Sequence, residues 1–95
     1  MYYLMNENKT VAAFSIERNT FSSYYRIRDV FGNLPNNFQS VSSWIEGRKE
    51  SSKYDLVSDD AVIHKESFLK LTHCKSDHDT FWVKDRHEHV MWEDI

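Results

Sequence analysis

The first 30 residues carry the pattern that most limits what this chain can fold into. Strand-like runs at 2–5, 11–17 and 21–30 are separated by polar turns at 6–9 and 18–20. The third run is rich in Tyr, Ile and Val, which favour strands. The second run has a period of two, which places one set of side chains on a single buried face. That set is Ala12, Phe14 and Ile16. We therefore expect an antiparallel meander of three strands.

A helix is expected after residues 31–37, where Gly and Pro interrupt the strand pattern. Either Asn37 or Ser40 can cap it. Its apolar side chains recur at three- and four-residue spacing, which predicts one core-facing stripe. The members of that stripe are Phe38, Val41, Trp44 and Ile45. Gly47 is expected near the end of this helix, and residues 50–53 form a polar linker.

The next segment supports two readings. Ser58-Asp59-Asp60 is typical of a helix start, with acidic residues in the first turn. A helix ending near Thr72 would then turn an apolar side towards the core. Its core residues would be Val62, Phe68, Leu69 and Leu71. The alternative makes residues 61–63 a short strand.

The C-terminal part predicts a hairpin. Residues 80–83 are β-favouring, residues 84–88 are polar and can turn, and residues 89–92 would return as a second strand. The expected fold class is therefore α+β. A small antiparallel sheet, made of the N-terminal meander and this hairpin, would carry about two helices in a single domain, 1–95.

Composition limits the surroundings and the partners. The chain has 95 residues, a formal net charge of -3 and one cysteine. The charges are interspersed, so nonspecific DNA binding, which needs a basic face, is not expected. A single cysteine forms no internal disulfide, and no signal peptide or membrane span is visible. We therefore expect a reducing compartment, the cytoplasm.

The segment 73–89 concentrates residues that bind metal. It holds the only cysteine and four of the five histidines. Cys74 and His78 are four residues apart, and a helix end or tight loop would point them the same way. His87 and His89 are two apart, and on a strand they would share a face. Folding the hairpin back would create a structural zinc site of Cys74, His78, His87 and His89.

Several alternatives to this site stay open. His73 or His64 could join the metal, and Asp77 or Asp79 could orient a ligand from outside the first shell of ligands. Without a metal, the histidines would be ordinary surface residues and the cysteine a small buried apolar residue. Glu88 could act as a general base only at an open site. We expect a closed site and no catalytic residues, so the protein is not expected to be an enzyme.

Two stretches resemble the leader module of proteins related to HipA-type kinases. They are Asp79-Thr80-Phe81-Trp82-Val83-Lys84 and Trp92-Glu93-Asp94-Ile95. Further likeness lies in Leu4-Met5-Asn6, Lys9-Thr10-Val11-Ala12, Leu34-Pro35 and Trp44…Arg48. The chain ends where the kinase would begin, so the resemblance implies a shared fold and not phosphoryl transfer. It also implies a regulatory module that binds a kinase.

A second resemblance is to a class of proteins. The length, the HCKSDH and HEH stretches and the mild acidity look like a small zinc-containing type II anti-CRISPR protein of phages and mobile elements. That class implies a non-enzymatic inhibitor that binds a CRISPR nuclease in the cytoplasm of a bacterial host and blocks nucleic-acid loading. This is the function that we expect, and a regulatory module that binds a kinase is the alternative. Exposed aromatic and arginine side chains would anchor it. The candidates are Tyr24, Trp82, Arg86 and Trp92.

Overall fold

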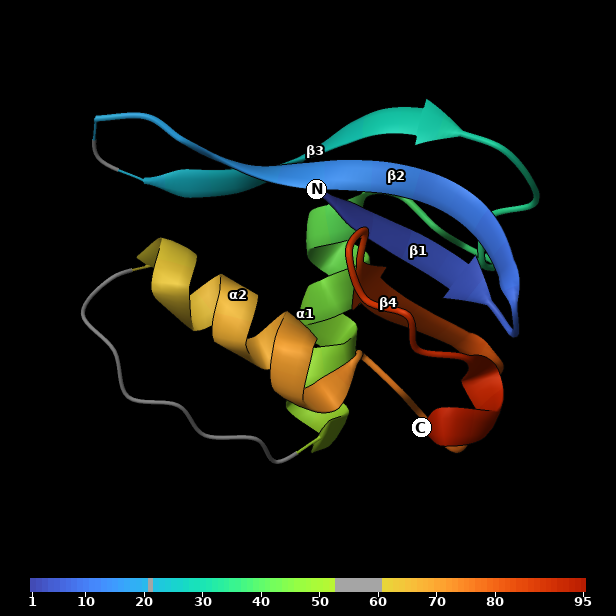
Figure 1. Ribbon diagram of the computed structural model, residues 1–95. Helices are drawn as coiled ribbons and strands as arrows, with labels where there is room; N and C mark the ends of the chain where they lie inside the picture. The colour runs from blue at the N-terminus through green and yellow to red at the C-terminus, as the bar shows by residue number, and fades with distance from the viewer. Residues whose placement is uncertain (21, 53–60) are drawn as a thin grey trace.

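A computed structural model describes residues 1–20, 22–52 and 61–95, with side chains except at 50–52 and 61–63. Within these residues a four-stranded antiparallel sheet carries two helices on one face (Figure 1). The predicted α+β class is confirmed. In chain order the elements are β1 (Tyr2–Asn6), β2 (Lys9–Arg18), β3 (Ser23–Val30), α1 (Val41–Ser52), α2 (Ala61–Thr72), β4 (Phe81–Asp85) and the 3-10 helix η1 (Trp92–Asp94).

The sheet has the strand order β3-β2-β1-β4, so the predicted N-terminal meander is confirmed and β4 extends it beside β1. The turn between β1 and β2 places Glu7 in the left-handed region at φ 51°. Residue 21, the first of the predicted third strand, lies outside the described residues. Because β1 is flanked on both sides, Leu4 sits between Ala12 and Val83 in the register.

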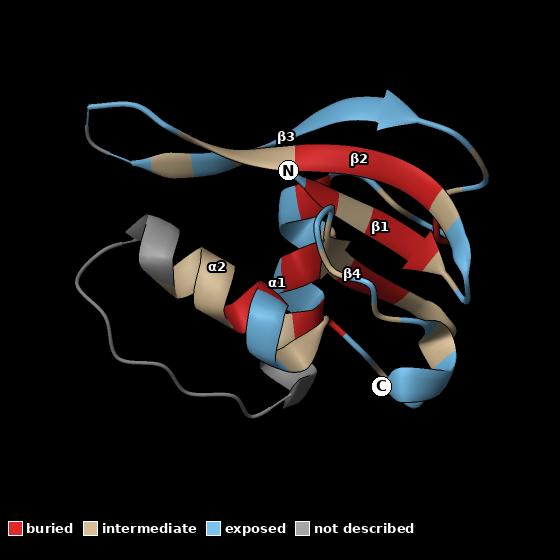
Figure 2. Cartoon of the chain, viewed as in Figure 1, coloured by how far each residue is buried: buried red, intermediate tan, exposed pale blue. Residues whose placement is uncertain are grey.

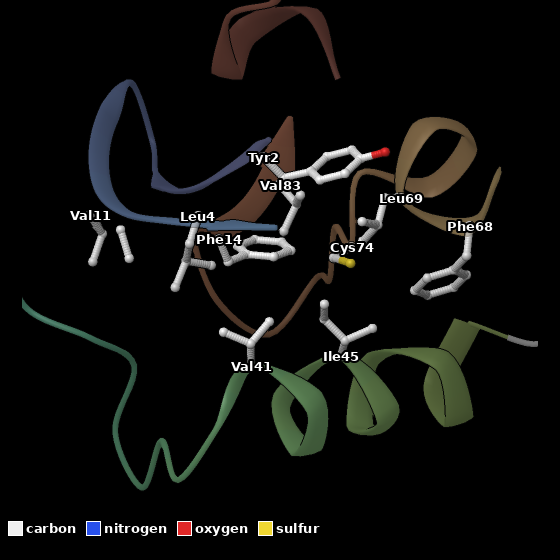
Figure 3. Close-up of a cluster of buried hydrophobic side chains, with 11 residues drawn as sticks. Tyr2, Leu4, Val11, Phe14, Val41, Ile45, Phe68, Leu69, Cys74 and Val83 are labelled. Carbon is white, nitrogen blue, oxygen red and sulfur yellow. The ribbon is translucent and has the colours of Figure 1, made fainter. Parts of the chain in front are cut away.

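The core lies between the sheet and the two helices (Figure 3). Leu4 and Phe14 from the sheet meet Ile45 of α1 and Phe68 of α2, each at most 2% exposed. Phe14 also stacks on the ring of Tyr2, with 5.7 Å between centroids. Removing such apolar surface from water is the main force that assembles these layers. Figure 2 shows buried residues along β1, β2 and β4, whereas β3 is mostly exposed.

Helix α1 begins directly after its cap. The Oγ of Ser40 accepts a hydrogen bond from the N–H of Ser43 at 3.1 Å, so Ser40, and not Asn37, is the cap. Phe38, expected on the helix, precedes it and packs on the core from the loop. Gly47 lies inside the helix, which continues into the predicted linker. Packing of the apolar stripe on the sheet outweighs the cost of about 1 kcal/mol for an interior glycine.

Helix α2 decides between the two readings of its segment. Residues 61–63 are helical, so the alternative strand is wrong. The predicted N-cap at 58–60 lies outside the described residues. Phe68 and Leu69 are buried as expected, but Leu71 is 68% exposed. At roughly 100° per residue, Leu71 points about 110° away from the midpoint between the two buried side chains.

The expected return strand at 89–92 does not form. The chain turns after β4, runs on without regular structure and ends in η1. The reason lies at the edge of β4, where the backbone N–H of Val83 donates to the carbonyl of His73 at 2.7 Å. That contact occupies the edge to which a return strand would have to pair.

The C-terminal segment is held instead by the turn between β1 and β2. The Asn8 side-chain oxygen accepts from the N–H of Trp92 at 2.8 Å, and its amide donates to Glu93 at 2.9 Å. Lys75 donates to the carbonyl of Ile95 at 2.6 Å. Of these contacts, the one from Trp92 to Asn8 satisfies a backbone group that the expected strand would have paired.

Candidate functional site

Cys74, the proposed thiolate ligand, lies in the hydrophobic core and is 1% exposed (Figure 3). Burial raises the pKa of its thiol to about 12, and the positive charge of Arg48 only partly offsets this. The residue closes the end of α2 in a left-handed conformation at φ 52°. Because zinc binds the thiolate, a metal here would have to overcome this burial.

His73 connects the end of α2 to β4. Its side-chain Nδ1 lies 2.9 Å from the backbone carbonyl oxygen of Val83. The backbone N–H of Val83 in turn donates to the backbone carbonyl of His73. Its Nε2 lies 3.8 Å from a carboxylate oxygen of Glu88. Its ring meets Trp82 edge to face, with 6.0 Å between centroids. Both ring nitrogens thus face groups that fix the imidazole between helix and sheet. Glu88, considered as a general base, accepts the N–H of Asp85 at 2.8 Å.

The other proposed ligands are exposed. His78, His87 and His89 lie on the surface, while Cys74 is inside. Within the described part of the chain, no three His, Cys, Asp or Glu side chains gather closely enough to hold a metal ion. In this arrangement the four residues do not fit a shared zinc, so a zinc site would require the chain around Cys74 to rearrange. The zinc site stays a prediction. His64, the possible further ligand, has its Nε2 buried without a hydrogen-bond partner among the described residues.

The surface contains a groove of about 450 Å³ that the sequence did not predict. It lies between α1, the loop before α1 and the start of β4. A smaller hollow of about 250 Å³ adjoins it and shares Trp44 as a wall. Next to the groove, a Cβ added to Gly47 would meet no atom within 4 Å, so the helix surface is open there. The lining residues are Pro35, Asn36, Ser43, Trp44, Gly47, Arg48, Asp79 and Phe81.

An ion pair forms the base of this groove. The guanidinium of Arg48 contacts both carboxylate oxygens of Asp79, at 2.5 and 2.7 Å. It also lies 4.6 Å from the ring centroid of Trp44, one helical turn earlier. Asp79 in turn accepts the N–H of Phe81 at 3.0 Å, which fixes the start of β4. Arg48 is 8% exposed and the Asp79 side chain 40%, so only the carboxylate reaches solvent appreciably.

The sequence did not predict this ion pair, and it offered Asp79 only as a residue that could orient a metal ligand. A usable pattern was present, because Trp44 and Arg48 are spaced four apart on a helix and so share a face. Asp79 follows a long intervening segment, and no local rule connects it to Arg48.

Comparisons with protein-family models, with curated proteins and with solved structures find no match. Among the described residues, neither helix has the length and apolar character that crossing a membrane requires. The geometry of the groove and of the exposed surface therefore carries the functional argument.

Proposed function

We propose that this protein acts in the bacterial cytoplasm by binding a larger protein, and that it catalyses no reaction of its own. The observation that carries this proposal is the groove at Arg48 and Asp79. Its walls come from residues 35–48 and 79–81, two parts of the chain that are far apart in the sequence, and an ion pair with an aromatic contact holds them together. Such a preformed hollow lets a partner segment dock at a small cost in conformational entropy.

The chemistry of the groove suits a protein segment. Pro35, Trp44 and Phe81 offer apolar and aromatic surface, while Asn36 and Ser43 offer side-chain hydrogen-bonding groups. Aromatic and arginine side chains are over-represented among residues that dominate binding energy. Because Arg48 is already paired, it would hold the shape of the groove, and the aromatic side chains would contact the partner.

A kinase domain of the HipA type is the partner class that we favour. Five residues of the stretches that carry the resemblance to its leader module line the groove: Pro35, Trp44, Arg48, Asp79 and Phe81. Trp82 and Glu93, from the same stretches, contact the turn between β1 and β2. This convergence supports a common role in one module. The proposed activity is docking on the kinase domain to regulate it.

A CRISPR nuclease is the second candidate partner. Two of the four anchors that the sequence nominated, Tyr24 and Arg86, are exposed, and Trp92 is half-buried. Trp82 is fully buried at 0% exposure, so it cannot be an anchor in this fold. The exposure of Tyr24 and Arg86 supports a docking surface through which the protein would bind and inhibit a nuclease.

Substitution of Gly47 separates these possibilities. Gly47→Leu would project a side chain into the open groove while improving helix propensity, so the fold should be retained. Gly47→Ala serves as the matched control because its single methyl group leaves the groove open. We would test retention of a purified HipA-like kinase domain and of a Cas9-type nuclease on the immobilised protein. We expect the kinase to be retained by the unsubstituted protein and by Gly47→Ala, and to be lost with Gly47→Leu.

Other outcomes contradict parts of the proposal. Retention of the nuclease alone would replace the favoured partner with the second one. Equal binding by Gly47→Leu would exclude the groove as the docking site. If neither protein is retained at micromolar concentration, both partner classes are excluded.

A further inference from the structure

The strand β3 forms an open edge of the sheet. In the described part of the chain it pairs with β2 only, over seven residue pairs from Ala12↔Val30 to Arg18↔Ser23. Figure 1 shows it at the rim of the sheet, farthest from β4. An edge strand points about half of its backbone N–H and C=O groups away from its neighbour, where another strand can pair with them. At the opposite rim, the contact between Val83 and His73 already occupies the edge of β4.

The two faces of β3 differ in character. Ile27 lies opposite Phe14, on the face that bears the helices, and yet it is 41% exposed. Val30 and the following Phe31 are 48% and 56% exposed. On the other face, Tyr24 lies opposite Glu17 and is 44% exposed. Figure 2 shows how far exposure extends along this strand. The edge therefore presents an apolar row on one face and a polar row on the other.

The polar row is cationic. The guanidinium groups of Arg26 and Arg28 share a single carboxylate, that of Glu17, and their side chains are 58% and 42% exposed. A hydrogen bond from Tyr24, followed by the two arginines, lowers the pKa of Glu17, so this carboxylate is ionised at neutral pH. Two cations on one anion leave positive charge on the edge of a chain whose net charge is -3.

At the hairpin end of the strand, a further cation lies on the helix-bearing face. Lys65 of α2 donates to the Oγ of Ser23 at 2.9 Å and lies 5.5 Å from the ring centroid of Tyr25. Arg18 lies opposite Ser23 in the register. Asp29, the acidic residue of β3, lies towards the other end and accepts the N–H of Val30. The cationic row on the face away from the helices is therefore formed by Arg26 and Arg28.

From these observations we infer that β3 binds an extended, acidic segment of a partner protein by strand addition. Backbone hydrogen bonds would extend the sheet, carboxylates at alternate positions would face Arg26 and Arg28, and apolar side chains between them would cover Ile27. A second copy of this chain fits less well, because antiparallel pairing of two β3 strands would bring their arginines together. Nucleic acid fits less well because the carboxylate of Glu17, on the neighbouring strand β2, contacts both arginines and would repel phosphates. The edge is separate from the groove, so this inference does not depend on the proposed partners.

The probe is a fluorescent peptide of the length of β3 in which Glu and Val alternate. We would measure its binding by anisotropy and map the contact from amide exchange of β3. We expect saturable binding, slower exchange at the β3 edge, and a loss of at least about tenfold in affinity in the double variant Arg26→Gln, Arg28→Gln. Arg86→Gln, which changes an exposed arginine elsewhere, is the matched control and should bind as before.

Two further peptides test the mechanism. A version with N-methyl groups at alternate residues keeps its charge but cannot pair through the backbone on one edge, and it should lose binding. Equal binding of the methylated peptide would reduce the effect to charge alone and overturn strand addition. Equal binding of a Lys–Val peptide would overturn the charge argument. Tighter binding of a single-stranded oligonucleotide, or dimerisation of the protein through β3, would assign the edge to a different occupant.

Discussion

Neutralising Asp79 should measure how strongly the ion pair holds the groove together. Asp79→Asn keeps a side-chain oxygen that can accept the N–H of Phe81, and it removes only the charge opposite Arg48. Breaking one partner of a fully buried pair costs about 3–5 kcal/mol. The Asp79 side chain is 40% exposed, and solvent screening reduces that figure. We therefore expect a loss of about 2 kcal/mol in the free energy of unfolding.

In a domain of this size, that loss lowers the melting temperature by about 8–16 °C. Urea unfolding followed by tryptophan fluorescence gives the free energy directly. Asp77→Asn, which neutralises an exposed carboxylate two residues away, is the control and should stay within about 0.5 kcal/mol of the unsubstituted protein. A double variant of Arg48→Met with Asp79→Asn should be less destabilised than the sum of the two single changes. If the single effects add within about 0.5 kcal/mol, the ion pair contributes no coupling energy and the reasoning is refuted.

Three other predictions concern the core and the zinc. Trp82→Phe removes the N–H that donates to the Glu7 carbonyl at 2.6 Å and should cost about 1–3 kcal/mol, measured from the urea midpoint; an unchanged midpoint would show that this bond is dispensable. Burial raises the pKa of Cys74 and Tyr2 to about 12 in the folded protein. The unfolded chain therefore releases these protons first, so stability should fall between about pH 9 and 12, less steeply in Cys74→Ala, and a flat pH profile would contradict this. The zinc site predicts one zinc per chain by elemental analysis, lost in Cys74→Ser and in His87→Ala, whereas a stable, metal-free protein would exclude it.

The strands and helices could be predicted because their patterns are local. The alternation in β2 predicts which face of the strand is apolar, and the three- and four-residue spacing in α1 does the same for the helix. In the structure these apolar faces pack in the core. One error lies where two apolar side chains could take the same buried position. Leu71 and Leu69 are chemically alike, and only the position of α2 on the sheet decides which one is buried.

The functional site could be predicted only in part. The Cys and His residues of 73–89 are close in sequence, but side chains close in sequence need not converge. Cys74 points into the core because α2 ends there in a left-handed turn, and the histidines of the following segment point to solvent. Nothing in the spacing of these residues specifies that turn.

The sequence by itself determined the α+β class, the meander, and the presence of two helices, because each depends on periodicity and turn residues within a short window. Only the tertiary structure decided that Arg48 meets Asp79, 31 residues later in the chain. It also decided that the backbone of His73 pairs with the outer edge of β4, which leaves β3 as the open edge of the sheet. The physical reason is that contacts between distant segments depend on how whole elements pack, and packing chooses among many pairings that the local pattern leaves equivalent.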